Sequence, residues 1–163
     1  MSTDDIRFRP MRCGAGHTHS VFEHSCAIQQ AVFVEEQDVR PEKVFEHQHE
    51  ATHYVCYILV DDAWLPVACA RVRQFQADRS IKIERVATLK EFRGNKYAHR
   101  LLEYIIQEQG ERYQPPFFFL NSQEAAVGLY LTLNFASKGD IFNEEGIRHV
   151  RMELEWPLAT AAA

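Results

Sequence analysis

Apolar and polar positions along the chain alternate between strand and helix periods. Residues 6–9 alternate at period two, which predicts a short opening strand. Between Ser20 and Glu36 the apolar residues follow helical spacings and predict a helix with two core-facing sets, Val21, Ile28 and Val32 in one and Phe22, Cys26 and Phe33 in the other. Pro41 ends this region, and a polar loop is expected from there to His53.

Two β-rich runs follow, at residues 54–60 and 65–72, and the short acidic link between them predicts a hairpin. A further strand contains Ile81 and Ile83. Its apolar pattern changes phase at Val86, as it would across a β-bulge.

The strongest helical pattern comes next, with an apolar stripe at Ala98, Leu101, Leu102, Ile105 and Ile106. The apolar run at residues 117–120 predicts a strand at the sheet centre, covered on both faces. Asn121 and Glu124 have the spacing of a capping box for a helix that reaches about Leu133. Asn134 suits the left-handed residue that closes such a helix.

Two more strands are expected near residues 135–142 and 149–156, with a turn around residues 143–146. The alternation of strands and helices predicts an α/β fold. Because no repeat or linker divides the chain, residues 1–163 are expected to form one domain, with a frayed tail at 158–163.

Composition narrows the class of protein. The chain has 163 residues, 46% of them hydrophobic, which fits one globular domain with a sizeable core. Its net charge of −5 argues against a general nucleic-acid or anionic-membrane binder. The first residues lack the features of a signal peptide and no apolar run approaches 18 residues, so a cytoplasmic location is expected. The four cysteines form no C-x-x-C pair, which favours reduced structural thiols.

Candidate chemistry is concentrated in residues 84–102, where a strand passes through a basic, glycine-containing turn into a helix. Free N–H groups at a helix N-terminus and the positive end of its dipole form a cradle for phosphate. Locally the charge is positive, because four cations face only Glu91: Lys90, Arg93, Lys96 and Arg100. An anionic ligand is therefore expected at residues 93–98, called the 93–98 turn below.

The same residues carry a resemblance to a known family. Arg-Gly-Asn-Lys-Tyr-Ala at 93–98 is similar to the R-G-x-G-x-G/A turn that binds the coenzyme A pyrophosphate in the GNAT superfamily of acyl-CoA N-acyltransferases. Residues 130–135, Tyr-Leu-Thr-Leu-Asn-Phe, resemble its Y-x-K-L-G-F helix end. Residues 32–37 and 142–152 resemble the V-F-V-x-E-Q and F-x-E-x-G-I-x-H-x-x-M segments of the ElaA-type branch.

The resemblance implies a single-domain GNAT fold, with a mixed, twisted sheet of about six to seven strands flanked by helices. The fourth and fifth strands would splay apart, and acyl-CoA would enter between them. The implied activity is transfer of an acetyl group from acetyl-CoA to a primary amine, by direct attack in a ternary complex. Small or peptide amines are the expected acceptors, and a homodimer is plausible from family habit.

The resemblance also implies site residues. Cofactor contacts are expected from Val86, Ala87, Thr88, Arg93, Gly94, Asn95, Lys96, Tyr97, Ala98, Asn121 and Tyr130. The Val86 N–H would stabilise the oxyanion, and Tyr130 would protonate the leaving thiolate as general acid. A buried core tyrosine is the alternative for Tyr130, and helix capping is the safer role for Asn121.

Two positions depart from the family pattern, since Asn134 and Lys96 stand where glycine is usual. Asn tolerates left-handed geometry, so the first change is mild. Lys96 would obstruct the cofactor if backbone and phosphate must approach closely. If helical dihedral angles suffice at that position, its cation would help, and we expect binding to be retained.

An amine must lose a proton before it attacks, at a cost of roughly 4 to 5 kcal/mol for a lysine-like amine at pH 7. The resemblance implies that Glu84 lies near the acceptor and makes it the first candidate for the base, and an ion pair with Lys82 or Arg85 is the alternative. Carboxylates and histidines near residues 46–53 and 144–149 are expected to attract a cationic acceptor, or else to form ordinary polar surface. The candidate acceptor-binding residues are Glu36, His53, Glu145 and His149.

No metal is expected, because neither His47, His49 and His53 nor Cys13, His17, His19 and Cys26 have a common zinc spacing. Two other functions stay open. A non-catalytic acyl-CoA-binding module is one, made credible by Lys96. An interaction domain whose basic turn is only a solvated helix start is the other.

Overall fold

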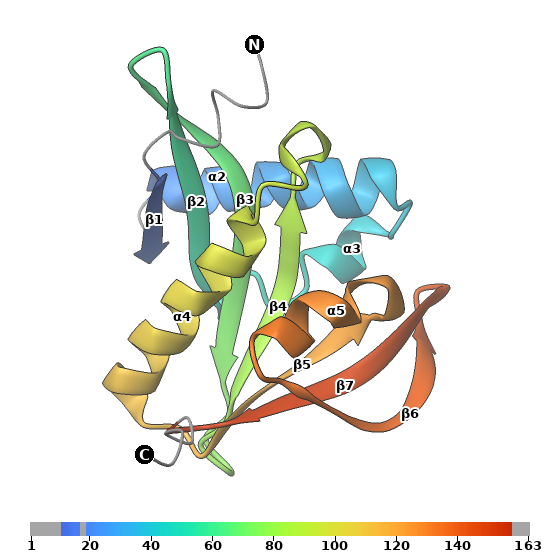
Figure 1. Ribbon diagram of the computed structural model, residues 1–163. Helices are drawn as coiled ribbons and strands as arrows, with labels where there is room; N and C mark the ends of the chain where they lie inside the picture. Colours follow the sequence, from blue (N-terminus) through green and yellow to red (C-terminus); the bar gives the residue numbers. More distant parts are fainter. Residues whose placement is uncertain (1–10, 17–18, 158–163) are drawn as a thin grey trace. The chain divides into compact units, whose positions relative to one another are not determined.

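The computed structural model describes residues 11–16 and 19–157, and its strands form one mixed sheet in the order β1-β2-β3-β4-β5-β7-β6 (Figure 1). The strands are β1 (Met11–Gly16), β2 (Thr52–Val60), β3 (Ala63–Gln74), β4 (Ile81–Thr88), β5 (Phe117–Gln123), β6 (Ala136–Glu144) and β7 (Ile147–Glu155). The α/β class and the strand number expected from the sequence are confirmed. The strand predicted at residues 6–9 and the tail at 158–163 lie outside the described residues.

The helices fall between these strands much as the sequence predicted. They are α2 (His19–Gln29), the π-helix η1 (Gln30–Glu36), α3 (Pro41–Val44), the 3₁₀ turn η2 (Lys90–Phe92), α4 (Tyr97–Tyr113), the 3₁₀ turn η3 (Glu124–Ala126) and α5 (Val127–Thr132). Among the described helices, none is both long and apolar enough to cross a membrane.

The chain divides into two compact units. The first unit comprises the chain up to Arg71 together with Arg85–Tyr104, and the second comprises Val72–Glu84 together with the chain from Ile105 onward. Because β3, β4 and α4 contribute residues to both, the division does not coincide with a linker.

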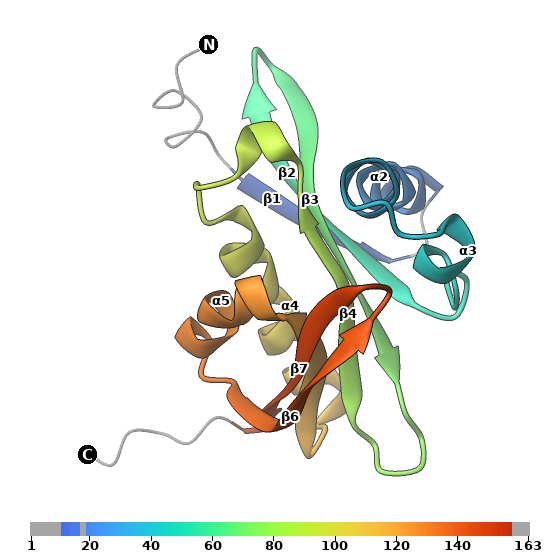
Figure 2. The same ribbon diagram turned by 90° about the vertical axis from the view of Figure 1, so that its right-hand side faces the viewer.

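In the first unit, β2 and β3 form the predicted hairpin, and its turn residues Asp61 and Asp62 have φ of 48° and 64°. Two such residues in succession match the twist of the strands they join. One face of this sheet packs on α2 and α3 in a core made of Ile28, Val32, Phe33, Val44, Val55, Tyr57, Cys69 and Ala87. On the other face Tyr54 meets Tyr104 of α4 edge to face, so β2 and β3 lie between α2 and the start of α4 (Figure 2).

Arg85 interrupts the regular alternation of β4. Its φ of 52° is left-handed, which agrees with an irregularity at this point of the strand, but the buried residue that follows is Ala87 and not the predicted Val86. Its guanidinium donates to the carbonyl oxygens of Val44 at 2.9 Å and Lys43 at 2.8 Å. These bonds satisfy carbonyls at the end of α3, a short helix in a segment that was expected to be only loop.

In the second unit, β4 and β5 are parallel and pair through Ile81 with Phe118 and Lys82 with Phe119, at the first residues of both strands. This short parallel pairing is where the expected splay of the fourth and fifth strands begins. On its other edge β5 pairs with β7 along its whole length, and β7 continues into the β6 hairpin (Figure 1).

Two expectations about β5 are wrong. Phe118 and Leu120 are buried, but Phe117 and Phe119 are only half-buried, so the strand is not covered on both faces. Asn121 does not cap a helix, because it lies within β5 opposite Arg151 and the helical turn begins after Gln123. Pairing with β7 supplies the backbone hydrogen bonds of this segment and therefore overrides the local capping signal.

Candidate functional site

The 93–98 turn follows η2 in the first unit and includes the first two residues of α4, as the sequence predicted. Gly94 has φ of 83° and Lys96 has φ of 63°, so two left-handed residues reverse the chain just before the helix. The Asn95 side chain donates to the carbonyl oxygens of Phe92 at 3.1 Å and Arg93 at 3.3 Å, which closes the turn from inside. The first N–H groups of α4 have no intrahelical acceptors and form a donor set for an anion.

From the sequence, the Lys96 cation was expected to aid cofactor binding if the backbone at this position were helical. The backbone is not helical there. Its left-handed φ explains why glycine suits this position, since a side chain there costs roughly 1 kcal/mol or more. The side chain itself is exposed, and the Lys96 carbonyl accepts the Arg100 N–H at 3.1 Å in the first turn of α4. The cost of lysine here is therefore conformational.

The Arg93 side chain is engaged within the protein. Nη1 and Nη2 donate to the two Glu36 carboxylate oxygens at 2.7 and 2.6 Å, and Nε donates to the Thr88 carbonyl at 3.0 Å. The hydrogen bonds from Arg93 lower the pKa of Glu36. The sequence predicted that Glu36 would bind the acceptor and that Arg93 would bind the cofactor. In the structure the two residues are in direct contact with each other.

The end of β4 combines core and backbone roles. Ala87 is buried in the first unit's core, whereas Val86 and Thr88 are half-buried. Beyond them, the Leu89 N–H donates to the Val67 carbonyl at 2.9 Å and ties this end of β4 to β3. Main-chain groups of Val86 and Thr88 are thus held on a rigid element, although Thr88 already uses its carbonyl oxygen for Arg93.

Tyr130 lies on α5 in the second unit and is only 5% exposed. Its ring packs edge to face on Phe135 at 5.9 Å between centroids. Burial raises the pKa of the Tyr130 phenol above its ordinary value, which already lies well above neutral pH. Asn134 follows α5 with φ of 69°, as expected for the residue that closes this helix. The tyrosine is therefore a packed core residue whose hydroxyl is protonated at neutral pH.

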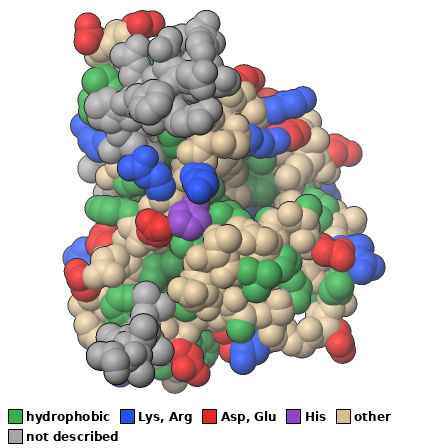
Figure 3. All heavy atoms as spheres, in the orientation of Figure 1, with side chains coloured by type: hydrophobic (Ala, Val, Ile, Leu, Met, Phe, Trp, Pro, Cys, Tyr) green, Lys and Arg blue, Asp and Glu red, His purple; other side chains and the backbone are tan. Residues whose placement is uncertain are grey.

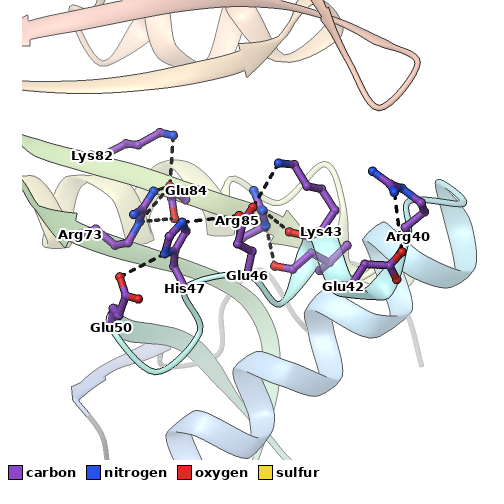
Figure 4. Close-up of polar contacts among 11 residues, drawn as sticks. Arg40, Glu42, Lys43, Glu46, His47, Glu50, Arg73, Lys82, Glu84 and Arg85 are labelled. Carbon is purple, nitrogen blue, oxygen red and sulfur yellow. Dashed lines mark hydrogen bonds and ion pairs between the residues drawn. The ribbon is translucent and has the colours of Figure 1, made fainter.

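Glu84, also in the second unit, is held between two cations. Arg73 makes bonds of 2.7 to 3.2 Å to both carboxylate oxygens, and Lys82 Nζ lies 3.2 Å from Oε1 (Figure 4). The sequence had offered Lys82 or Arg85 as partners, but Arg85 binds carbonyls in the first unit. Arg73 was missed, because only the pairing of neighbouring strands brings it to Glu84.

The remaining acceptor candidates occupy different environments. His53 is fully buried, with Nδ1 2.9 Å from Ser25 Oγ and Nε2 2.7 Å from the Gln48 carbonyl. His149 stacks on Phe142 and its Nδ1 donates to the Ile147 carbonyl at 2.7 Å, beside the hairpin turn that contains Glu145. The bonds of His53 favour a structural role, whereas the β6–β7 turn offers more accessible polar groups.

The network around His53 contains buried polar residues that the sequence had not singled out. Gln29 donates to Ser25 at 3.0 Å, and Arg71, only 1% exposed, donates to Gln48 Oε1 at 2.6 Å. These polar residues occupy positions where the sequence pattern would place ordinary core residues. The sequence alone therefore does not distinguish them.

Charges of both signs mix on the face drawn in Figure 3, where Lys and Arg lie beside Asp and Glu. Within residues 11–16 and 19–157, no three His, Cys, Asp or Glu side chains are grouped to hold a metal ion.

Comparison with known proteins identifies the family of this chain. Residues 23–156 match the model of the acetyltransferase (GNAT) domain. The chain belongs to the GNAT family. A Bacillus subtilis (strain 168) protein named "Putative acetyltransferase BSU40680" is 35% identical to this GNAT chain over 138 residues, which cover 82% of it and 86% of the relative.

Solved structures agree on the fold. Escherichia coli ElaA superposes with a TM-score of 0.76 at 20% identity, covering 90% of this GNAT chain and 100% of ElaA. Spermidine N-acetyltransferase from Vibrio cholerae, solved with CoA and spermine, gives a TM-score of 0.66 at 14% identity, covering 89% and 95% of the two chains. The GNAT fold and the ElaA-like relatives expected from the sequence are confirmed, and acyl transfer is the chemistry of this family.

Proposed function

We propose that this protein transfers the acetyl group of acetyl-CoA to a primary amine, by direct attack within a ternary complex. The observation that carries the proposal is the 93–98 turn, in which left-handed Gly94 and Lys96 precede the free amides of α4. Such a run of amides suits a diphosphate. A family relative solved with CoA supports the same class of cofactor.

The reaction needs few groups from the protein. The amine nitrogen, once neutral, bonds to the thioester carbon, and the carbon–sulfur bond of acetyl-CoA breaks. The Val86 N–H would stabilise the oxyanion that forms between these events. The nitrogen releases its extra proton to the base or to water, which leaves a neutral amide. Tyr130 would then donate its phenolic proton to the departing thiolate, which requires the sulfur end of the cofactor to reach this hydroxyl. The phenol is protonated at neutral pH, as a proton donor must be.

The geometry constrains the choice of base for the amine proton, because Glu84 already pairs with Arg73 and Lys82. We retain Glu84 as candidate, acting directly or through water. Glu84→Gln keeps the shape of the side chain and removes its capacity to accept a proton. A base role predicts a loss of kcat that shrinks as pH rises, since more amine is then neutral. An ion-pair role predicts lower thermal stability with an unshifted pH–rate profile.

Acceptor recognition is proposed for the β6–β7 turn, where Glu145 and His149 lie close in the chain and Glu144 Oε2 is 3.9 Å from His149 Nε2. Negative charge there favours a cationic small amine or a peptide amine. Residues 1–163 would act as one catalytic domain, in the cytoplasm, with a homodimer as the proposed assembly.

Two measurements on the full chain test this function. Calorimetry with coenzyme A measures cofactor binding, and thiol release from acetyl-CoA is followed with a panel of polyamines, amino acids and peptides. Binding together with amine-dependent thiol release is the expected result. Binding without release by any amine would favour a non-catalytic acyl-CoA-binding module. Absence of coenzyme A binding would overturn both and leave an interaction domain.

A further inference from the structure

Glu36 and Arg93 are joined across 57 positions of the chain by a bidentate ion pair. Glu36 is the last residue of η1, and Arg93 is the first residue of the 93–98 turn. Both residues lie in the first unit. Two parallel N–H···O bonds between a guanidinium and a carboxylate fix the orientation of both groups, which a single bond would not do.

The same guanidinium also fixes the approach to the turn. Its third donor, Nε, binds the Thr88 carbonyl at 3.0 Å, so the Arg93 side chain folds back over η2 to the end of β4. The Asn95 side chain closes the next residues from within. Together these bonds hold the segment from Thr88 to Asn95 by side-chain contacts at both of its ends.

A turn of this kind needs such support, because Gly94 and Lys96 both have left-handed backbones. A non-glycine residue in that region persists only when its surroundings determine the conformation. The ion pair itself is partly exposed, at 41% and 35% of the two side chains, so little global stability is expected from it. Its consequence is geometric: it determines where the amides after Arg93 lie.

On the basis of the proposed function, we infer that Glu36 is a positioning residue for the cofactor's diphosphate, and not an acceptor-binding carboxylate. It holds Arg93, and Arg93 holds the 93–98 turn in the conformation that presents its amides. The Arg93 guanidinium balances the charge of the Glu36 carboxylate, which reduces its attraction for a cationic amine. The lowered pKa of Glu36 agrees, because Arg93 stabilises its charged form. This role also links two segments that the sequence had marked separately, residues 32–37 and 93–98.

The test uses Glu36→Gln in the full chain, with coenzyme A affinity measured by calorimetry and initial rates measured against both substrates. The variant keeps one oxygen acceptor and loses the charge and the second acceptor. We expect the dissociation constant of coenzyme A and the KM of acetyl-CoA to rise about fivefold, with kcat and the amine KM unchanged. Glu35→Gln is the matched control, because it removes a neighbouring exposed carboxylate for which no bond to the turn is found among the described residues.

A second probe separates positioning from general destabilisation. S-acetylpantetheine carries the thioester but no diphosphate, so its kcat/KM should be the same for wild type and Glu36→Gln. Arg93→Gln should weaken coenzyme A binding by a similar factor, and the double variant should be no weaker than the worse single variant, because the two residues act as one unit.

Several outcomes would overturn the inference. A raised amine KM with unchanged coenzyme A affinity in Glu36→Gln would return this carboxylate to the acceptor pocket. An equal loss with S-acetylpantetheine would show a general structural role. If wild type itself fails to bind coenzyme A, the proposed function fails; if wild type binds and Glu36→Gln binds equally well, only the positioning role fails.

Discussion

The 93–98 turn and the surroundings of Tyr130 differ in where their chemistry comes from. The turn is polar and largely exposed, and what it offers is backbone amides held by left-handed residues and by Arg93. Tyr130 offers one side-chain hydroxyl, which is buried and has a raised pKa. A substitution that changes the backbone conformation should therefore impair the 93–98 turn. At Tyr130, removal of the hydroxyl oxygen alone should be enough.

The largest effect is expected from Tyr130→Phe, which removes the proposed acid and leaves the ring packed on Phe135. Loss of a general acid lowers kcat by about 100-fold or more, while coenzyme A affinity should stay unchanged. Steady-state rates and calorimetry measure the two quantities. Tyr113→Phe is the control, because Tyr113 is 40% exposed. An undiminished kcat in Tyr130→Phe would leave this tyrosine with a packing role alone.

Gly94→Ala tests whether the turn depends on backbone conformation. A Cβ at Gly94 would meet no atom within 4 Å, so the effect comes from the φ of 83° alone. We expect a loss of about 1 to 2 kcal/mol in the free energy of unfolding and about tenfold weaker coenzyme A binding.

The matched control for that variant is Gly139→Ala. Gly139 has φ of 81°, an equally open Cβ position and a place in β6, in the second unit. We expect the Gly139→Ala protein to lose a similar free energy of unfolding, measured by denaturant unfolding. Its affinity for coenzyme A should equal that of wild type. Equal loss of affinity in both variants would contradict a specific role for the turn.

Lys96→Gly asks whether the strained lysine helps or hinders. Removal of the left-handed side chain should raise the free energy of unfolding by up to about 1 kcal/mol. Asp62→Gly, at φ of 64° in the β2–β3 turn, should show a similar gain and controls for glycine itself. We expect coenzyme A to bind the Lys96→Gly protein about two- to threefold more weakly, for want of a cation. Much tighter binding by calorimetry would instead mean that the lysine obstructs the cofactor.

The smallest effect concerns pH and belongs to Tyr130. Because burial raises its pKa, the folded state keeps the phenolic proton more tightly than the unfolded chain does. The related stability is complete below the ordinary pKa of about 10 and declines as pH rises through it. Free energies of unfolding between about pH 9 and 11 should fall more steeply for wild type than for Tyr130→Phe, by a few tenths of a kcal/mol near pH 10. If the free energy of unfolding falls equally with pH in both proteins, the pKa of Tyr130 is not raised.

Much of the fold was predictable, because periodicity reports which side chains face a core. The long helices and the β2–β3 hairpin leave such a pattern. Asn121 shows the limit of this approach. The sequence around Asn121 favours a helix cap locally. In the structure, strand pairing between β5 and β7 supplies the backbone hydrogen bonds of this segment instead.

The candidate site divides in the same way. Glycine-containing turns leave a recognisable sequence, so the amino-acid pattern alone predicts an anion cradle at residues 93–98. The partners of charged side chains were not predictable, since Arg73 and Glu84 are paired by neighbouring strands and Glu36 and Arg93 by two distant segments. No local pattern encodes either pair.

The sequence by itself therefore determined the α/β class, the order of elements and the 93–98 turn, because these depend on local propensity and spacing. Only the tertiary structure decided that Lys96 is left-handed, that Tyr130 is buried and that Glu36 binds Arg93. Those properties depend on which residues distant in sequence come within bonding distance. Such contacts are set by how strands and helices pack, and packing joins segments whose separation along the chain carries no signal of their meeting.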